Sequence, residues 1–244
     1  KGLIINEPVM LSDEAKIGMR RDSLFVGTFI IIHVGARFLS ASFEIAKNSK
    51  DAFQPAATFV SLLWSNMHES NIVLFEHVTW WIALGLILGF LPYFPYSKHA
   101  HLFMGPLNYM ATKPKASMAA IEAIDFEDDS IEQFGAGKIE DLPQKQILDA
   151  FACIQCSRCQ DACPAYETGK ELSPSAIEIN KRYFLNNHLS DFANGLKLDS
   201  SITDIALTEE AAWSCTTCGY CIEVCPVGNE PMLDILHARQ DLVM

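Results

Sequence analysis

The sequence lacks the residue patterns on which most enzymes and nucleic-acid-binding proteins depend. It has no glycine-rich nucleotide-binding loop and no recognisable nucleophile beside a base. Basic residues are scarce, with 18 Lys and Arg against 30 Asp and Glu, so the formal net charge is −12. An acidic chain is repelled by phosphates. The composition therefore excludes nucleic acid as a partner and gives no sign of a substrate-transforming site.

A secretory leader is also missing from the sequence. No segment combines a charged start, a short apolar core and a small-residue cleavage site. The chain begins at Lys1 rather than at methionine. We therefore expect it to be a fragment of a longer polypeptide.

Cysteine is absent outside two short runs, and both runs read C-x-x-C-x-x-C-x-x-x-C-P. Three thiolates at this spacing wrap one face of a [4Fe–4S] cluster, and in two-cluster proteins the fourth ligand comes from the other run. We therefore predict a cluster 1 and a cluster 2. The predicted ligands are Cys153, Cys156, Cys159 and Cys225 for cluster 1, and Cys215, Cys218, Cys221 and Cys163 for cluster 2.

Two other uses of eight cysteines fit this pattern poorly. Structural zinc typically takes four ligands arranged as two C-x-x-C pairs. Disulfides belong to secreted proteins, and two identical runs do not resemble a disulfide framework. Thiolate ligation indicates a reducing compartment, which places the cysteine-rich half in the cytoplasm.

The charge divides the chain into two parts. Residues 1–115 carry ten basic and eight acidic residues, a net of +2, whereas residues 116–244 carry eight and 22, a net of −14. The near-neutral part contains apolar stretches at about 24–43 and 72–94, each long enough to cross a hydrocarbon layer of roughly 30 Å as a helix. A buried helical hairpin of a soluble protein is the alternative interpretation.

Basic residues flank the two predicted spans, which favours a cytoplasmic position for both outer ends. Lys16, Arg20 and Arg21 precede the first span and Lys98, Lys113 and Lys115 follow the second, whereas Lys47 and Lys50 lie between the spans. We expect a multi-pass protein of the cell inner membrane, in contact with lipid, with the cysteine half on the cytoplasmic side.

Ionisable residues inside apolar spans are costly and demand an explanation. The spans contain His33, Arg37, Glu76 and His77. They would either contact haem or quinone, or make polar contacts to other membrane helices or subunits. His33 and His77 differ in predicted depth by roughly 10 Å, which makes them a poor pair of ligands for one haem.

Two stretches carry a resemblance to a known family. Residues 80–110, WWIALGLILGFLPYFPYSKHAHLFMGPLNYM, and 134–164, FGAGKIEDLPQKQILDAFACIQCSRCQDACP, resemble the membrane-bound heterodisulfide-reductase-like iron–sulfur proteins. In these a nitrate-reductase-gamma-like cytochrome b part is fused to a two-[4Fe–4S] domain. The resemblance implies haem b, a quinone such as menaquinone or ubiquinone, and partner subunits that include a flavoprotein or a cysteine-rich CCG module.

This sequence departs from the family pattern at two points. Ala83 stands where the family has a haem-binding histidine, while His99 and His101 remain as candidates for haem or quinone contacts. The cysteines of the CCG modules are absent.

The predicted fold class is all-α, with a transmembrane helical hairpin before an α-helical two-cluster ferredoxin domain. We expect a membrane domain at 1–115, an acidic linker at 116–148 and the two-cluster domain at 149–244, which resembles fumarate reductase iron–sulfur subunits. Helices are predicted at 144–152, from Pro174 after the N-cap Ser173, after Thr208, and at 231–241. The residues expected to shield the clusters are Ile154, Ala165, Ile222, Val224 and Val227.

The sequence therefore predicts a membrane-anchored electron-transfer subunit of a quinone-linked oxidoreductase. It would pass electrons between a soluble donor or catalytic module and haem b or quinone in the membrane. The alternative is an anchor and electron-wire subunit of a larger respiratory or photosynthetic complex, without a haem or quinone site of its own.

Overall fold

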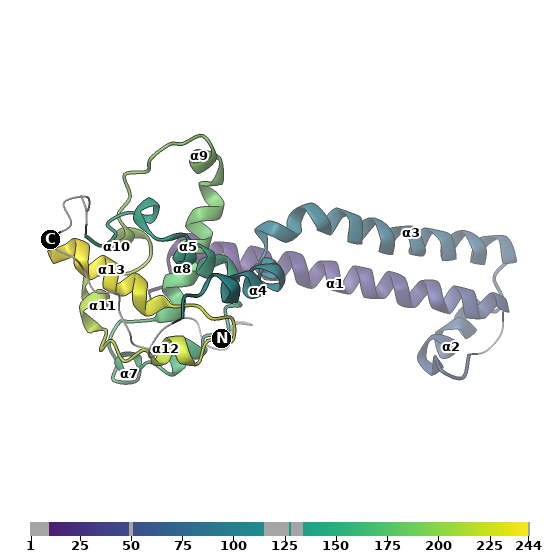
Figure 1. Cartoon of the computed structure of the whole chain (residues 1–244). Coiled ribbons are helices and arrows are strands. Elements are labelled where there is room, and N and C mark those ends of the chain that lie inside the picture. The colour runs from purple at the N-terminus through teal and green to yellow at the C-terminus, as the bar shows by residue number, and fades with distance from the viewer. Residues whose placement is uncertain (1–9, 49–50, 115–126, 128–133, 244) are drawn as a thin grey trace. The chain divides into compact units, whose positions relative to one another are not determined.

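The computed structural model describes residues 10–48, 51–114, 127 and 134–243 (Figure 1). Over these residues the chain is helical, with one isolated bridge between Lys138 and Ser201 and no strand. This agrees with the helical class predicted from the sequence. The α-helices are α1 (Asp13–Asn48), α2 (Pro55–Ser61), α3 (Glu69–Tyr93), α4 (His101–Ala111), α5 (Gln144–Ala152), α6 (Arg158–Asp161), α7 (Pro164–Glu167), α8 (Pro174–Asn187), α9 (Leu189–Ala193), α10 (Ile202–Ile205), α11 (Glu209–Ser214), α12 (Tyr220–Glu223) and α13 (Pro231–Val243). Short 3-10 helices are η1 (Leu62–Trp64), η2 (Phe94–Tyr96), η3 (Lys98–Ala100) and η4 (Ile139–Asp141).

The chain divides into two compact units. Residues 20–97 form one, here called the apolar unit, and residues 1–19 together with 98–244 form the other, here called the cysteine unit. The sequence placed the end of the membrane domain at residue 115, whereas the structural boundary follows Ser97. The difference arises because α4 packs against α5 of the cysteine unit.

Two long helices dominate the apolar unit, and they run antiparallel (Figure 1). Aromatic rings join them along their length: Phe25 meets Tyr93 at 4.2 Å between centroids, and Phe29 meets Phe90 at 4.7 Å. At the other end of the unit Phe43 contacts Phe75 and Trp64, whose indole donates a hydrogen bond to Ser42. The predicted spans at 24–43 and 72–94 therefore lie within α1 and in α3 with the first residue of η2.

The outer surface of this hairpin is apolar and exposed. Two segments, Asp13–Asn48 and Glu69–Tyr96, are long and apolar enough to cross a membrane, and only 11% of the most apolar window of each is buried. Large side chains such as Leu24, Ile31 and Trp81 are more than three-fifths exposed. A hairpin in the core of a soluble protein would bury these side chains, so the exposure favours contact with lipid.

Helix α8 is the centre of the cysteine unit. Its residues from Pro174 to Arg182 are all buried. Leu11 and the first residues of α1, Ala15 and Met19, pack beside Ala176 and Ile179 of α8. The Asn180 side chain donates to the Met10 carbonyl at 2.9 Å and accepts from the Ser12 amide at 3.0 Å. The ten residues before the apolar unit are thus part of the fold that holds the cysteines.

The predicted helix starts of the cysteine unit are confirmed. The Ser173 hydroxyl accepts a hydrogen bond from the Ala176 amide, with Pro174 in the first turn. The Thr208 hydroxyl accepts from the Ala211 amide at the start of α11. Helix α5 has the predicted bounds. These ends are readable in sequence because each cap satisfies backbone donors that the helix itself leaves without partners.

The structure differs from the predicted acidic linker over residues 134–148. Ala136, Ile139 and Leu142 are buried in the cysteine unit. The Ala136 amide donates to the His237 carbonyl on α13 at 3.0 Å, and Gly135 adopts a φ of 83° where an added Cβ would lie 2.4 Å from that carbonyl. This segment is therefore packed rather than solvated. Most of the preceding acidic stretch lies outside the described residues.

Candidate iron–sulfur centres

The two cysteine runs sit on a structural repeat. Helix α5 ends at Ala152, immediately before the first run, and α11 ends at Ser214, immediately before the second. The short helices α6 and α12 follow at corresponding positions, and each pair is offset by 62 residues (214 minus 152). The expected quasi-symmetry of the two halves is therefore present in the backbone.

Each run contains two residues in the left-handed region. Gln155 and Ser157 have φ values of 58° and 60°, and their counterparts Thr217 and Gly219 have 52° and 75°. In this conformation the Gln155 amide donates to the Cys153 sulfur at 3.4 Å, and the Thr217 amide donates to the Cys215 sulfur at 3.3 Å. Non-glycine residues in this region cost about 1–3 kcal/mol each and are retained mainly at functional sites.

The cysteines line two neighbouring cavities. The Cys221 side chain lines both cavities and therefore forms part of the wall of each. The first cavity is lined by Cys153, Cys156, Cys159, Cys225 and Cys221. The second is lined by Cys163, Cys215, Cys218 and Cys221.

This arrangement agrees with exchange of the fourth cysteine between the runs. Cys225 from the second run lies with the first three cysteines of the first run, and Cys163 lies with the first three of the second. Within the described residues no three His, Cys, Asp or Glu side chains are placed to hold a single metal ion. The assignment of each thiolate to a cluster stays a prediction, which these linings support.

Burial opposes ionisation of several of these thiols. Burial, followed by the nearby Glu178 carboxylate, raises the pKa of Cys153 to about 12. Burial likewise raises the pKa of Cys221 to about 12, and it raises the pKa of Cys159, Cys215 and Cys225. A buried thiolate is favourable only beside a compensating charge such as iron. At least four cysteines line each apolar-walled cavity, a set that suits a [4Fe–4S] cluster.

Apolar side chains complete the two cavity walls, and the sequence identified some of them. Ile154 and Val227 line the first cavity as expected. Leu172, Met232 and Ile235 line the second, and no sequence signal marked them because they lie outside the cysteine runs. The other predicted shielding residues line neither cavity: Ile222 and Val224 are half-buried, and Ala165 is buried in the core.

Two arginines occupy corresponding positions in the repeat, and sequence reasoning missed them. Arg182 donates to the Cys153 carbonyl at 3.2 Å, and Arg239 donates to the Cys215 carbonyl. Helices α8 and α13 both begin with proline, at Pro174 and Pro231, and aligning those prolines pairs the arginines at an offset of 57 residues. Each arginine thus holds the backbone of the first cysteine of a run.

The same alignment shows a difference between the two cavities. Glu178 is 1% exposed and lines the first cavity, whereas Ile235, its counterpart, lines the second. Burial raises the pKa of the Glu178 carboxyl well above its usual value, although Lys181 at 3.1 Å opposes this. The surroundings of the two clusters are therefore not equivalent.

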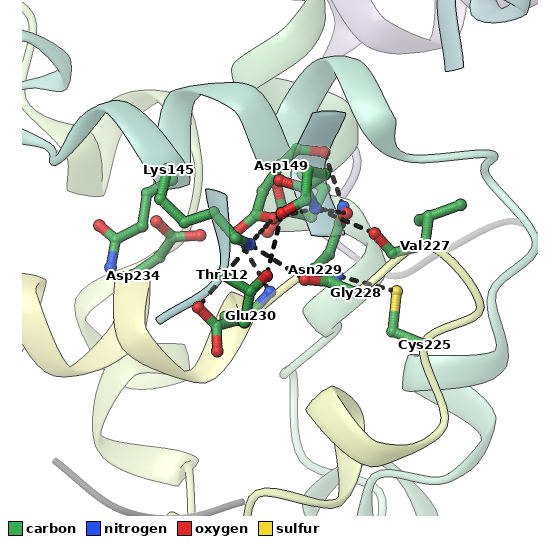
Figure 2. Close-up of polar contacts among 12 residues, drawn as sticks. Thr112, Lys145, Asp149, Cys225, Val227, Gly228, Asn229, Glu230 and Asp234 are labelled. Atoms are coloured by element: carbon green, nitrogen blue, oxygen red, sulfur yellow. Dashed lines mark hydrogen bonds and ion pairs between the residues drawn. The ribbon is translucent and has the colours of Figure 1, made fainter. Parts of the chain in front are cut away.

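A buried polar network surrounds the loop after Cys225 (Figure 2). Asp149 on α5 accepts from the Lys145 ammonium at 2.6 Å and from the Glu230 amide at 3.1 Å. The Asn229 side chain donates to the Asp149 carbonyl, and the Asn229 amide donates to the Cys225 sulfur at 3.2 Å. Asn229 thus connects the network to Cys225, a predicted cluster ligand.

The predicted haem or quinone residues of the apolar unit lie at separate points along the hairpin. His33 is half-buried, with Nδ1 3.1 Å from the Ala83 carbonyl and its ring stacked on Phe29. The Glu76 carboxylate lies 3.8 Å from the Lys47 ammonium. Arg37 and His77 are exposed. Sequence reasoning missed the hydrogen bond that the Tyr93 hydroxyl donates to the buried Asp22 carboxylate.

The two remaining candidate histidines belong to the cysteine unit. The rings of His99 and His101 lie 6.4 Å apart, and His101 Nδ1 is within hydrogen-bond distance of the Lys98 carbonyl. Both are half-buried near the start of α4.

Comparison with known proteins agrees with this geometry. Residues 149–229 match the family model described as a 4Fe-4S dicluster domain. No solved structure matches the chain.

Curated relatives extend the similarity beyond that domain. A probable iron–sulfur-binding oxidoreductase, FadF, of Bacillus subtilis is 35% identical over 78% of this chain and 32% of its own length. The EtfAB:quinone oxidoreductase of Syntrophomonas wolfei is 29% identical over 79% of this chain and 30% of its own length. A probable membrane-anchored ferredoxin of Chromohalobacter salexigens is 30% identical over 51% of this chain and 21% of its own length.

The chain thus spans about a third or less of the length of these relatives. The comparisons do not show the heterodisulfide-reductase-like features that the sequence led us to expect. The chain carries a 4Fe-4S dicluster ferredoxin domain and is homologous to iron–sulfur oxidoreductase subunits that transfer electrons.

Proposed function

We propose that this protein is a membrane-anchored electron-transfer subunit of a quinone-linked oxidoreductase. The observation that carries the proposal is the pair of cysteine-lined cavities that share Cys221. Each bound cluster would supply one-electron transfer. With one ligand side chain common to both walls, an electron would cross from one site to the other over a short distance.

The chain's own residues serve this role by binding and shielding. The backbone amides of Gln155, Thr217 and Asn229 donate to ligand sulfurs, which stabilises their negative charge. The apolar linings keep water from the thiolates. Neither cavity needs to admit a substrate for electrons to pass.

The apolar unit supports the membrane part of the proposal. Its helices expose large apolar side chains, and one relative bears the name membrane-anchored ferredoxin. We place it in the cell inner membrane as a multi-pass segment, with the cysteine unit on the cytoplasmic side. The name EtfAB:quinone oxidoreductase supports a quinone as the membrane partner and a flavoprotein or CCG-type module as the soluble one.

Anaerobic purification in detergent tests the proposal. We expect about eight irons per chain, EPR signals of two reduced [4Fe–4S] clusters, and reoxidation of those clusters by added quinone. A preparation that holds the iron but is not reoxidised by quinone, and that lacks haem, would favour the anchor and electron-wire alternative. Purification without detergent as a soluble monomer would contradict both.

His33 is the most informative single position for the haem or quinone site. Its Nδ1 contacts the carbonyl of Ala83, the residue at which the family resemblance implies a haem-binding histidine. If His33 contacts haem or quinone, His33→Ala should remove the haem absorbance or slow quinone-dependent reoxidation. His68→Ala, at an exposed position just before α3 and outside the predicted spans, is the matched comparison. An unchanged spectrum and rate for His33→Ala would make His33 a structural residue.

A further inference from the structure

The loops that follow the two fourth cysteines differ, although the runs themselves repeat. After Cys163 the chain forms α7, in which the Glu167 amide donates to the Cys163 carbonyl at 3.0 Å. After Cys225 no helix follows before α13, and Gly228 adopts a φ of 70°. The second loop is five residues shorter, since the offset between the halves falls from 62 to 57. Within this loop the Gly228 amide donates to the Cys225 carbonyl at 3.3 Å, but the loop has no helical turn like α7.

Asn108 on α4 supplies contacts that this short loop lacks. The residue is fully buried, and its side-chain amide lies within hydrogen-bond distance of three acceptors. They are Asp149 Oδ1 at 2.7 Å, the Val227 carbonyl at 3.0 Å and Asn229 Oδ1 at 3.1 Å. One side chain thus joins three elements: α4, α5 and the loop after Cys225.

Close packing fixes α4 on the same loop. A Cβ added to Gly228 would lie 3.0 Å from the Tyr109 ring, and a Cβ added to Gly105 would lie 3.5 Å from Val227. The loop in turn places the Asn229 amide 3.2 Å from the Cys225 sulfur. A chain of direct contacts therefore runs from α4 to the thiol that lines the first cavity.

We propose that Asn108 is a positioning residue for cluster 1, because it holds the loop that presents Cys225. The chain after Cys163, the corresponding predicted ligand of cluster 2, instead forms the helix α7. The inference rests on the proposed binding of cluster 1 by Cys225. It makes α4, which lies outside the matched dicluster domain at 149–229, part of one cluster site only.

Iron release from the anaerobically purified full chain tests this proposal. In Asn108→Ala we expect the iron of cluster 1, about half of the total, to pass to an added chelator at least about fivefold faster than in the wild type. Leaving buried acceptors without a donor costs at least about 1 kcal/mol, which corresponds to that ratio. The EPR signal that disappears first should be that of cluster 1. The variants Cys156→Ser and Cys218→Ser, which each perturb one run, assign the two signals.

The controls separate a local effect from a general one. Asn108→Ser keeps a donor in a smaller side chain and should give an intermediate rate. Asn187→Ala removes the same side chain at an exposed site of α8 and should leave both clusters unchanged. Equal loss of both clusters in the Asn108 variants, or unchanged release of both, would overturn the proposal. Neither result bears on quinone reoxidation, whereas a wild-type protein without iron would remove the proposed function itself.

Discussion

Replacing Cys225 by serine is expected to remove the same cluster as replacing Cys153, although the two residues lie in different runs. Cys225 and Cys153 line the first cavity together, whereas Cys215 and Cys163 line the second. Each single replacement should lower the iron content from about eight to about four per chain, because a cubane with three thiolate ligands is readily lost. Iron analysis and EPR of the reduced protein measure this effect.

The reciprocal pair provides the control for this prediction. Cys163→Ser and Cys215→Ser should both spare the signal that Cys225→Ser removes. If Cys225→Ser instead gave the spectrum of Cys215→Ser, each run would hold its own cluster. The exchange of fourth ligands, and with it the assignment of both sites, would then be wrong.

Replacing Lys181 by methionine should destabilise the cysteine unit severely. Lys181 is fully buried, and its ammonium contacts Asp234 at 2.6 Å, the Gln146 carbonyl at 2.8 Å and Glu178 at 3.1 Å. Removing one partner of a buried ion pair costs about 3–5 kcal/mol because the remaining charge has no compensation. For a chain of this size that cost lowers the melting temperature by about 6–20 °C.

The pH dependence of this contribution follows from the direction of the pKa shift. Burial alone would lower the pKa of Lys181, but the carboxylates of Asp234, Glu178 and Asp149 raise it above the usual lysine value. A raised pKa in the folded state gives stability that is complete below about pH 10 and is lost only at higher pH. In the wild type, titration of Lys181 itself should therefore leave stability unchanged from about pH 6 to about pH 8, and its loss should begin only above about pH 10.

Thermal unfolding of the anaerobic protein measures this prediction against two comparisons. Lys170→Met removes an exposed lysine and should change the melting temperature little. Lys181→Met combined with Asp234→Leu should recover part of the loss, because an apolar pair of similar volume replaces the ion pair. A Lys181→Met protein as stable as the Lys170→Met control would show that the buried cluster of charges is dispensable.

The parts of the fold that the sequence predicted are those set by local chemistry. The spacing of the cysteines predicted which thiols would come together, and the caps at Ser173 and Thr208 predicted where α8 and α11 begin. Periodicity was not needed for the apolar helices, because length and composition alone identify them. Ligation of the clusters by those thiols stays a prediction.

The parts that the sequence did not predict depend on contacts between distant residues. Asn108 and Asn180 are ordinary polar residues in sequence, yet they bond across 121 and 170 positions to Asn229 and Met10. Likewise, the segment at 134–148 reads as an acidic linker, because nothing local reveals that Gly135 fits against the His237 carbonyl. Burial of such residues follows from the assembled fold and not from the pattern of neighbours.

The order of the units along the chain has a practical consequence. Residues 10–19 and 98–114 both belong to the cysteine unit, so the apolar hairpin is an insertion within it and not a leader attached to one end. A truncated protein that starts at residue 134 would leave Ile179 and Asn229 without the helices that cover them. Conversely, proteolysis near residues 65–68, between η1 and α3, would leave α1 and α3 on separate fragments. Each fragment would still include residues that belong to the cysteine unit. Cleavage there should yield two fragments that still co-purify.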